Sequence, residues 1–161
     1  MSSGVTGDRL GVYLQERIVG YLWLDARQRF TFQYDPAWIE LSGSMAISLS
    51  LPLRMEPYPD DLARPFFANL LPEAEIRRVI VRRLGISEKN DFLLLKKIGG
   101  ECAGAVSVLP EGDLPQDTPG YRELDEDELT RIIAELPKKP LMAGEQGIRL
   151  SLAGAQNKLP I

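Results

Sequence analysis

Apolar and polar residues alternate with a period of two in the first part of the chain. The alternating runs are residues 9–15, 18–24 and 30–34. This period is typical of strands with one buried face, and Glu16 and Arg17 between the first two runs predict a tight hairpin. We therefore expect an antiparallel meander in which Leu10, Val12 and Leu14 share one face.

Three aromatic residues, Tyr13, Tyr21 and Trp23, fall on the other face of this meander. Two interpretations are open: a sheet face that other parts of the chain cover, or a platform for a ligand. Because aromatic side chains are favoured in strands whatever their role, the pattern favours the covered face.

The stretch after the meander predicts a helical turn at 37–41, a strand at 46–51 and a loop at 54–65. Asp35 and Pro36 are typical of a helix start, with the aspartate as N-cap and the proline at the first helical position. Pro52 ends the predicted strand, and three prolines and two aspartates indicate the loop. We expect Phe66 and Phe67 to form a packed turn after it.

Two helices are predicted next, over residues 73–85 and 87–98, followed by a strand at 103–109. Pro72 opens the first helix and Gly85 ends it, whereas Ser87 caps the second, which Gly99 closes. The apolar stripe of the first helix consists of Ile76, Val79, Ile80 and Leu84. The second helix is apolar over a wide enough arc to be buried.

Charge is distributed unevenly along the second half of the chain. Residues 64–97 contain eight basic and four acidic residues, whereas residues 111–135 contain nine acidic and two basic ones. The arginines that lie off the stripe of the first helix are Arg77, Arg78, Arg82 and Arg83. A solvated basic face is the simpler interpretation, and a site for an acidic partner is the alternative. The two charged regions either attract each other or face different partners.

The acidic region divides into a proline-containing linker at 110–120 and an amphipathic helix. Asp125 followed by Glu128 resembles a capping box at the start of that helix. Its predicted buried stripe is Leu129, Ile132, Ile133 and Leu136. We expect the linker to be the most protease-sensitive stretch, because it buries little backbone.

Length and composition limit the possible functions. The chain has 161 residues, 44% of them hydrophobic, and a net charge of −4, so it is about one domain long and gives no support for general nucleic-acid binding. It has no histidine and one cysteine, Cys102, which excludes His-based triads, His-ligated metal sites and an internal disulfide. No signal peptide or membrane-length apolar run is present, so we expect a cytoplasmic protein without membrane contact.

Residues 147–161 carry the candidate site. Ile148, Leu150 and Leu152 alternate with polar residues, as in a half-buried strand, and a loop of small residues follows. Gly154 lets a ligand approach the backbone, consecutive N–H groups form an anion-binding concavity, and Lys158 adds a positive charge. An ordinary tight turn explains the same residues, because small residues are the default in turns.

Three ordered motifs resemble the HipA family, the serine/threonine kinase toxins of bacterial toxin–antitoxin pairs. They are residues 66–73 (FFANLLPE), 99–106 (GGECAGAV) and 151–158 (SLAGAQNK). The resemblance covers nearly the whole chain, and the chain stops at Ile161, where the kinase core of such a protein would begin. Ala74 stands where the family usually has glycine, a departure that affects only the local turn.

The resemblance implies that the loop in 151–158 covers the phosphates of ATP, as the glycine-rich loop does in other protein kinases. The phosphate-facing residues that it implies are Ala153, Gly154, Ala155, Gln156, Asn157 and Lys158. Ser151 matches the serine that the family autophosphorylates. The family's catalytic aspartate, metal ligands and main ATP lysine lie beyond Ile161. No catalytic residue is therefore assigned in this chain, and ATP and Mg²⁺ are expected only for the full-length parent.

The fold expected from these patterns is α+β, an antiparallel sheet meander packed against two or three helices. The resemblance adds a C-terminal hairpin or loop segment that belongs to the kinase N-lobe. The expected organisation is a HipA N-terminal subdomain at 1–109, a linker at 110–120, and the amphipathic helix with the start of the kinase domain at 121–161.

For the full-length parent, the resemblance implies phosphorylation of a protein such as glutamyl-tRNA synthetase, and a HipB-like DNA-binding antitoxin as partner. We expect no direct nucleic-acid contact by this part and no kinase activity from this chain alone. Two alternatives remain. One is a stand-alone regulatory module that binds and inhibits a separate kinase chain, and the other is an interaction domain without any link to a kinase.

Overall fold

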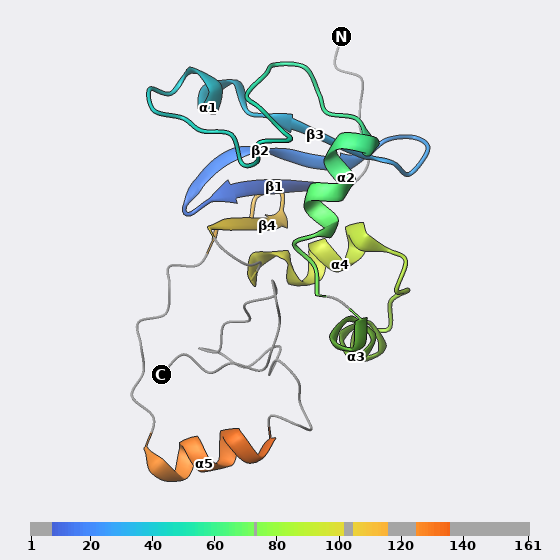
Figure 1. The fold of residues 1–161 in the computed structure, drawn as a ribbon, viewed down its shortest axis with the longest axis vertical. Coiled ribbons are helices and arrows are strands. Elements are labelled where there is room, and N and C mark those ends of the chain that lie inside the picture. Colours follow the sequence, from blue (N-terminus) through green and yellow to red (C-terminus); the bar gives the residue numbers. More distant parts are fainter. Residues whose placement is uncertain (1–7, 73, 102–104, 116–124, 136–161) are drawn as a thin grey trace.

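The computed structural model describes residues 8–72, 74–101, 105–115 and 125–135. Within these residues the chain forms one four-stranded sheet, five α-helices and a 3-10 turn, η1 (Gly99–Glu101) (Figure 1). The strands are β1 (Arg9–Leu14), β2 (Arg17–Leu24), β3 (Phe30–Tyr34) and β4 (Val106–Pro110). The helices are α1 (Pro36–Glu40), α2 (Asp60–Ala68), α3 (Ala74–Leu84), α4 (Asp91–Ile98) and α5 (Glu126–Glu135). The expected α+β class is confirmed.

The sheet is antiparallel throughout, in the order β3-β2-β1-β4. Both hairpins predicted from the alternating runs are confirmed, because β1 pairs with β2 and β2 pairs with β3. Each hairpin turns through a residue with positive φ, Gln15 at 56° and Gln28 at 60°. The last predicted strand is β4, which begins at Val106 and pairs with β1 so that Leu10 lies opposite Pro110.

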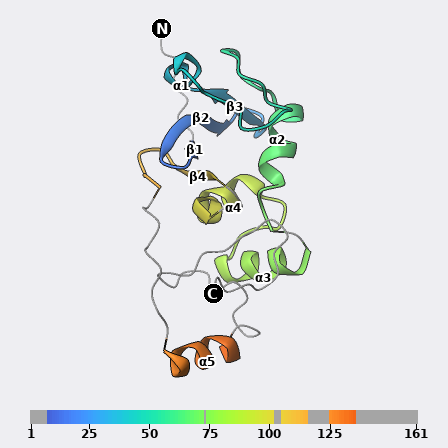
Figure 2. The ribbon, with the colours of Figure 1, turned by 60° about the vertical axis from the view of Figure 1, so that its left-hand side comes forward.

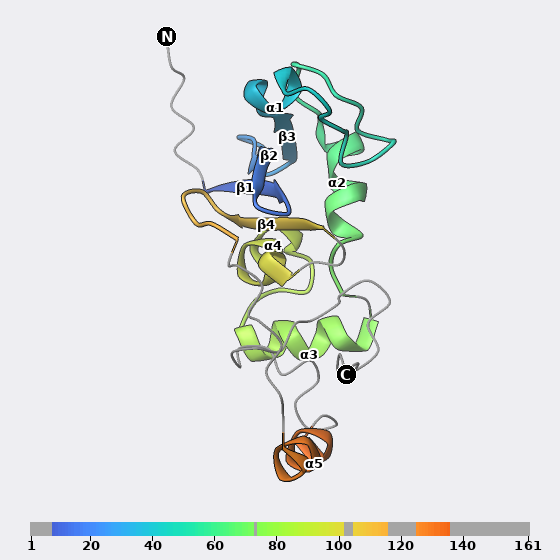
Figure 3. The ribbon, with the colours of Figure 1, turned by 90° about the vertical axis from the view of Figure 1, so that its left-hand side faces the viewer.

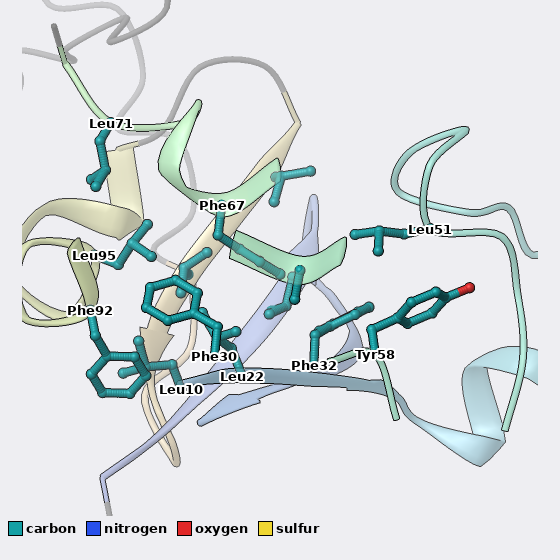
Figure 4. Close-up of a cluster of buried hydrophobic side chains, with 14 of the residues drawn as sticks. Leu10, Leu22, Phe30, Phe32, Leu51, Tyr58, Phe67, Leu71, Phe92 and Leu95 are labelled. Carbon is teal, nitrogen blue, oxygen red and sulfur yellow. The ribbon is translucent and has the colours of Figure 1, made fainter. Parts of the chain in front are cut away.

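One face of the sheet carries the hydrophobic core, beneath α2 and α4 (Figure 4). Phe32 lies within it, with its ring centroid 4.9 Å from that of Tyr34, 5.3 Å from Phe67 and 6.2 Å from Tyr58. The aliphatic side chains with no exposed surface are Leu10, Val12, Val19, Leu22, Leu51, Ala63, Leu94, Leu95 and Val108. The predicted inward face is thus confirmed, although Leu14 at the strand end is only partly buried.

The strand predicted at 46–51 is wrong, because this stretch is a loop with one isolated bridge between Ser48 and Leu51. The loop folds back on itself, since the Ser48 carbonyl accepts the N–H of Leu51 at 3.1 Å. Tyr34 takes the place of a partner strand: its hydroxyl donates to the Leu51 carbonyl at 2.5 Å and accepts the N–H of Ile47 at 3.0 Å. Burial raises the pKa of Tyr34 to about 12.

The loop predicted at 54–65 is wrong in its second half, which forms α2 with Pro65 inside the helix. The acidic residues of the first turn, beginning with Asp60, lie at the positive end of the helix dipole, where their negative charge stabilises the helix. Pro65 lacks one backbone N–H, so the helix forgoes one hydrogen bond there. Phe66 and Phe67 therefore belong to the last turn of α2, and Phe67 is fully buried.

Helix α3 confirms the first predicted helix and ends at Leu84, directly before Gly85, whose φ is +66°. The predicted stripe is wrong in detail. Ile80 and Val81 are buried, whereas Val79 is 41% exposed and Leu84 is 39% exposed. The buried side is rotated by about one residue from the expected one.

The four arginines of α3 do not share one environment. Arg77 turns toward α4, where its guanidinium donates to the Glu88 carbonyl at 3.0 Å and pairs with Asp91. The exposed members are Arg78, Arg82 and Arg83. Three of the four arginines are therefore exposed, whereas Arg77 is not part of a basic face, and the choice between a solvated face and a site for an acidic partner stays open for the other three.

Helix α4 begins at Asp91 and not near Ser87, because Asn90 is its N-cap and accepts a first-turn N–H at 2.9 Å. Ser87 instead accepts the Asn90 N–H in the preceding turn. The helix ends at Gly99 as predicted, and a Cβ there would lie 2.5 Å from the Val108 carbonyl oxygen. Only glycine allows α4 and β4 to approach this closely.

The start of the predicted 110–120 linker is part of the folded unit. The N–H of Glu111 donates to the Arg9 carbonyl at 2.9 Å, and the Tyr13 hydroxyl donates to the Asp113 carbonyl at 2.9 Å. Residues from 116 onward in this linker lie outside the described residues. The domain boundaries stay a prediction.

Helix α5 confirms the predicted amphipathic helix and its start, because the Asp125 carboxylate accepts the N–H of Glu128 at 2.7 Å. Two members of its predicted stripe are described: Leu129 is partly buried and Ile133 is 54% exposed. The side chains of Ile132 and Leu136 lie outside the described residues. Helices α3 and α5 both lie at the end of the molecule away from the sheet (Figures 2 and 3).

Candidate functional site

The site predicted from the sequence, residues 151–158, lies outside the described residues. This applies to Ser151 and to the whole implied phosphate loop: Ala153, Gly154, Ala155, Gln156, Asn157 and Lys158. Their roles stay predictions. Among the described residues, side chains converge in a polar cluster, on the outer face of the sheet and on one exposed loop.

The polar cluster joins the sheet to α2, α3 and α4. Asp60 at the start of α2 accepts the N–H of Phe30 at 2.6 Å and pairs with Arg64 one turn later at 3.0 Å. Arg64 also reaches Asp91 at 3.3 Å, and Asp91 pairs with Arg77 of α3. Two carboxylates therefore balance two guanidinium groups, and the cluster holds three helices in register with β3.

A shallow pocket of about 300 Å³ opens beside this cluster. Phe30 and Phe92 line it, edge to face with ring centroids 5.9 Å apart, and the Arg64 guanidinium lies 4.4 Å from the Phe30 centroid. Lys89 also lines the pocket, and no described residue forms an ion pair with it. Because Phe30 and Phe92 are buried, the accessible groups of this pocket are mainly the polar side chains at its rim.

On the outer face of the sheet, Arg9 lies over Tyr21, with its guanidinium carbon 3.8 Å from the ring centroid and 5.8 Å from that of Trp23. Arg9 also pairs with Glu111 at 3.3 Å. Tyr13 is 6% exposed, and burial raises its pKa above the ordinary value. The covered-face interpretation is confirmed for Tyr13, whereas Tyr21 and Trp23 stay partly exposed under Arg9.

The loop between α1 and α2 exposes large apolar side chains. Leu49 at its tip is fully exposed, and Met45 and Met55 are 59% and 50% exposed. Sequence reasoning missed this surface, because the alternation in residues 46–51 was interpreted as a strand. Single exposed apolar side chains are normal on protein surfaces, so these three residues do not by themselves define a site.

Ion pairing, stacking and apolar contact are the interactions that the described residues offer. Across these residues, no helix has the length and apolar content to cross a membrane. Nor do they bring together three or more histidine, cysteine or acidic side chains that would hold a metal ion. The fold and these features define a small α+β domain built around one antiparallel sheet.

Comparison with known proteins places this domain in a family. The HipA N-terminal domain matches residues 10–109, the stretch that runs from β1 to β4. The chain belongs to this family, as the motifs had indicated.

Relatives extend the match beyond the domain. A putative kinase of Sinorhizobium fredii, Y4mE, is 44% identical over 159 residues, which cover 94% of this chain and 37% of that protein. The serine/threonine-protein kinase toxin HipA of Shewanella oneidensis is 31% identical over 151 residues, which cover 93% of this chain and 34% of that protein. This chain thus spans about a third of the length of these two kinases.

Two further comparisons bear on the architecture. The structure of Shewanella oneidensis HipA with HipB and its operator DNA aligns with a TM-score of 0.65 and 29% identity, over 93% of this chain and 34% of that one. An uncharacterized protein of Haemophilus influenzae is 31% identical over 100 residues, which cover 62% of this chain and 90% of that protein.

Proposed function

We propose that this chain acts as the N-terminal part of a HipA-like serine/threonine kinase toxin of a toxin–antitoxin pair. The observation that carries the proposal is the match with the HipA kinase toxin of Shewanella oneidensis, which covers 93% of this chain but 34% of that protein. The described domain supplies a scaffold in which an ion-pair cluster links the sheet to three helices. The chemistry belongs to the kinase domain that such a scaffold accompanies.

In this function, residues 151–158 form one half of a lid over the phosphates of ATP. Backbone N–H groups around Gly154 donate hydrogen bonds to the phosphate oxygens, because a loop of small residues lets them form an anion-binding concavity. The ammonium group of Lys158 adds a positive charge beside them. ATP with Mg²⁺ supplies the phosphoryl group when bound. Phosphoryl transfer depends on positioning and electrostatics, so a misplaced lid lowers the rate even with the catalytic groups intact.

The lid is tested in a chain that carries this sequence together with its kinase domain. Lys158→Ala removes the positive charge and is expected to raise the KM for Mg-ATP and lower kcat, whereas Lys89→Ala in the described domain serves as a matched lysine control. Transfer of labelled phosphate measures both variants. Equal kinetics for the two would remove residues 151–158 from the ATP site.

The 161-residue chain alone is expected to be inactive and to bind Mg-ATP weakly or not at all. Calorimetry measures this directly. A micromolar dissociation constant would show that the chain carries a complete nucleotide site, which contradicts its role as one half of a lid.

Autophosphorylation at Ser151 is proposed to switch such a kinase off. A phosphate adds about −1.5 to −2 charge two residues before the loop that holds the phosphates of ATP. Like-charge repulsion then drives the loop from its closed form. Phosphopeptide mass spectrometry after incubation with Mg-ATP, with Ser151→Ala as control, follows the modification. An active kinase that never modifies Ser151, or a modified form with full ATP affinity, would contradict the switch.

A HipB-like antitoxin is the proposed protein partner, because the related Shewanella oneidensis HipA is found with HipB and operator DNA. Glutamyl-tRNA synthetase is the proposed kind of target for the full-length kinase. Co-purification of the complete kinase with the product of the neighbouring gene tests the partner. In vitro phosphorylation of the synthetase tests the target separately.

A second candidate function is a stand-alone module that binds and inhibits a separate kinase chain. The Haemophilus influenzae relative favours it, because 90% of that protein aligns with this chain. Titration of the 161-residue chain into a separately expressed kinase domain distinguishes the two. Inhibition at stoichiometric concentration supports the module, whereas restored activity supports a part of the kinase itself.

A further inference from the structure

Three exposed arginines, Arg78, Arg82 and Arg83, form a basic surface on α3. No described residue forms an ion pair with any of them. Arg77 on the same helix differs, because its guanidinium pairs with Asp91 of α4. The helix thus ties in the one arginine that meets a carboxylate of its own chain, and the charges of the other three are left for solvent or for a partner.

Helical spacing makes the basic surface of α3 continuous. Arg82 lies one turn after Arg78, and Arg83 lies one turn after Val79. Val79 is 41% exposed, so an apolar side chain lies among the three guanidinium groups. Helix α3 lies beyond α4, at the end of the domain away from the sheet (Figure 3). Because these four side chains are exposed, a partner can reach them without displacing any described element of the fold.

The helix dipole explains only part of this basic surface. Arg82 and Arg83 are in the last turn, where positive charge stabilises a helix. Arg78 lies in the middle of the helix, outside the reach of that effect. Its charge is instead repelled by that of Arg82 one turn later. A carboxylate placed between Arg78 and Arg82 would turn this repulsion into attraction.

We propose that the basic surface of α3 binds an acidic helix of another protein. The one-turn spacing of its arginines matches the spacing of carboxylates along one side of a helix. Val79 favours a protein over a phosphate backbone, because an amphipathic helix carries an apolar side chain beside its carboxylates and a phosphate backbone does not. The net charge of −4 also disfavours a long polyanion such as DNA, which the rest of the chain would repel.

The expected contact is small and concerns the folded domain alone. One side of a single helix buries less surface than a standard interface, so binding should be weak and should fall as the salt concentration rises. Neither ATP nor residues 151–158 take part in it. The proposal therefore goes beyond the proposed kinase function, and the two fail independently.

Titration of the 161-residue chain with a synthetic peptide tests the proposal. The probe is a helical peptide with glutamates one turn apart on both sides of a leucine stripe, and its control has the same composition in scrambled order. We expect the patterned peptide to bind more tightly, as measured by fluorescence anisotropy of the labelled peptides. Equal affinity for the two peptides would overturn the proposal.

Removal of charge then locates the binding surface. Arg78→Gln with Arg82→Gln is expected to weaken binding of the patterned peptide about tenfold, the effect of two exposed ion pairs. Glutamine is a strong helix former, so α3 should persist, and circular dichroism checks this. The matched control, Arg17→Gln with Arg27→Gln, removes the same charge from two exposed arginines of the hairpins and should leave the affinity unchanged. An equal loss in both double variants would overturn the proposal.

Val79→Ser distinguishes an acidic helix from other anionic partners. Loss of the apolar contact is expected to weaken binding of the patterned peptide about threefold, and unchanged affinity would contradict an amphipathic partner. Duplex DNA and vesicles that contain phosphatidylserine are titrated in parallel. If either binds more tightly than the peptide and loses its binding with Arg78→Gln and Arg82→Gln, the surface serves nucleic acid or a membrane, and the proposal is wrong.

Discussion

The two faces of one sheet differ in composition and in how they are covered. The inner face packs Phe32, Leu22 and their neighbours beneath α2 and α4, and among the described residues no polar or charged side chain is buried there. The outer face carries Arg9, Tyr21 and Trp23, and among the described residues the segment after β4 contacts this face through Glu111 and Asp113. We therefore expect stability to depend mainly on the inner face and less on the partly solvated outer one.

Removal of an inner aromatic ring is expected to have the largest effect. Phe32→Ala deletes a side chain with no exposed surface and three aromatic neighbours, and should lower the free energy of unfolding by about 3–5 kcal/mol. Tyr21→Ala on the opposite face is the matched control and should cost clearly less, because Tyr21 is partly exposed. Denaturant titration measures both. Equal losses would mean that the two faces contribute alike.

A smaller contrast is expected between two glycines of the central strands. A Cβ at Gly20 would lie 2.3 Å from the Gln33 carbonyl oxygen, whereas one at Gly11 would first meet the flexible ring of Tyr13 at 2.9 Å. Gly20→Ala should therefore cost about 1–3 kcal/mol by overpacking, and Gly11→Ala less. Thermal unfolding of the two variants tests the order, and a larger loss at Gly11 would contradict it.

The next prediction concerns stability at high pH. The pKa of Tyr34 on the inner face is about 12 in the folded state, against about 10 for an unfolded chain. The unfolded state therefore loses its proton first, so stability is complete below pH 10 and falls as the pH rises toward 12, by about 2 kcal/mol. Tyr34→Phe should remove this part of the decline, as followed by denaturant titration at each pH. Parallel profiles for the two proteins would show that Tyr34 does not carry it.

The smallest effect is expected on the outer face, at Arg9. Arg9→Ala removes the cation–π contact with Tyr21 and the ion pair with Glu111, both of which are partly solvated. The loss should be about 1 kcal/mol or less, and most of it should vanish at high salt if the ion pair dominates. Arg9→Lys separates the two contacts, since lysine keeps the charge but stacks less well. If Arg9→Ala lowered the free energy of unfolding as much as Phe32→Ala does, the two faces would contribute equally to stability and the comparison would be wrong.

The meander could be predicted from the sequence because its signal is local. Alternation in residues 9–15, 18–24 and 30–34 fixes both the strands and the inward face, and Asp35 caps α1 as its type suggests. The family resemblance was equally accessible, since three short motifs carry it. These features depend on neighbours in the chain and need no tertiary information.

Tertiary contacts decided the features that sequence reasoning missed. Residues 46–51 alternate like a strand, but they do not pair with a neighbouring strand. The Tyr34 hydroxyl instead bonds the N–H of Ile47 and the carbonyl of Leu51. Arg77 resembles the other arginines of α3 until Asp91, on another helix, is seen to bind it. The candidate ATP loop at 151–158 rests on the motif alone, because it lies outside the described residues.

The pairing of β1 with β4 determines when this domain can complete its sheet during synthesis. Arg9 and Glu111, which pair across that edge, are 102 positions apart in the chain. At about 5–20 residues per second, a ribosome needs roughly 5–20 seconds to make the intervening residues. Throughout that time β1 presents an open edge that invites pairing with other nascent chains. The yield of this protein should therefore depend on how well this edge is protected during synthesis as well as on its final stability.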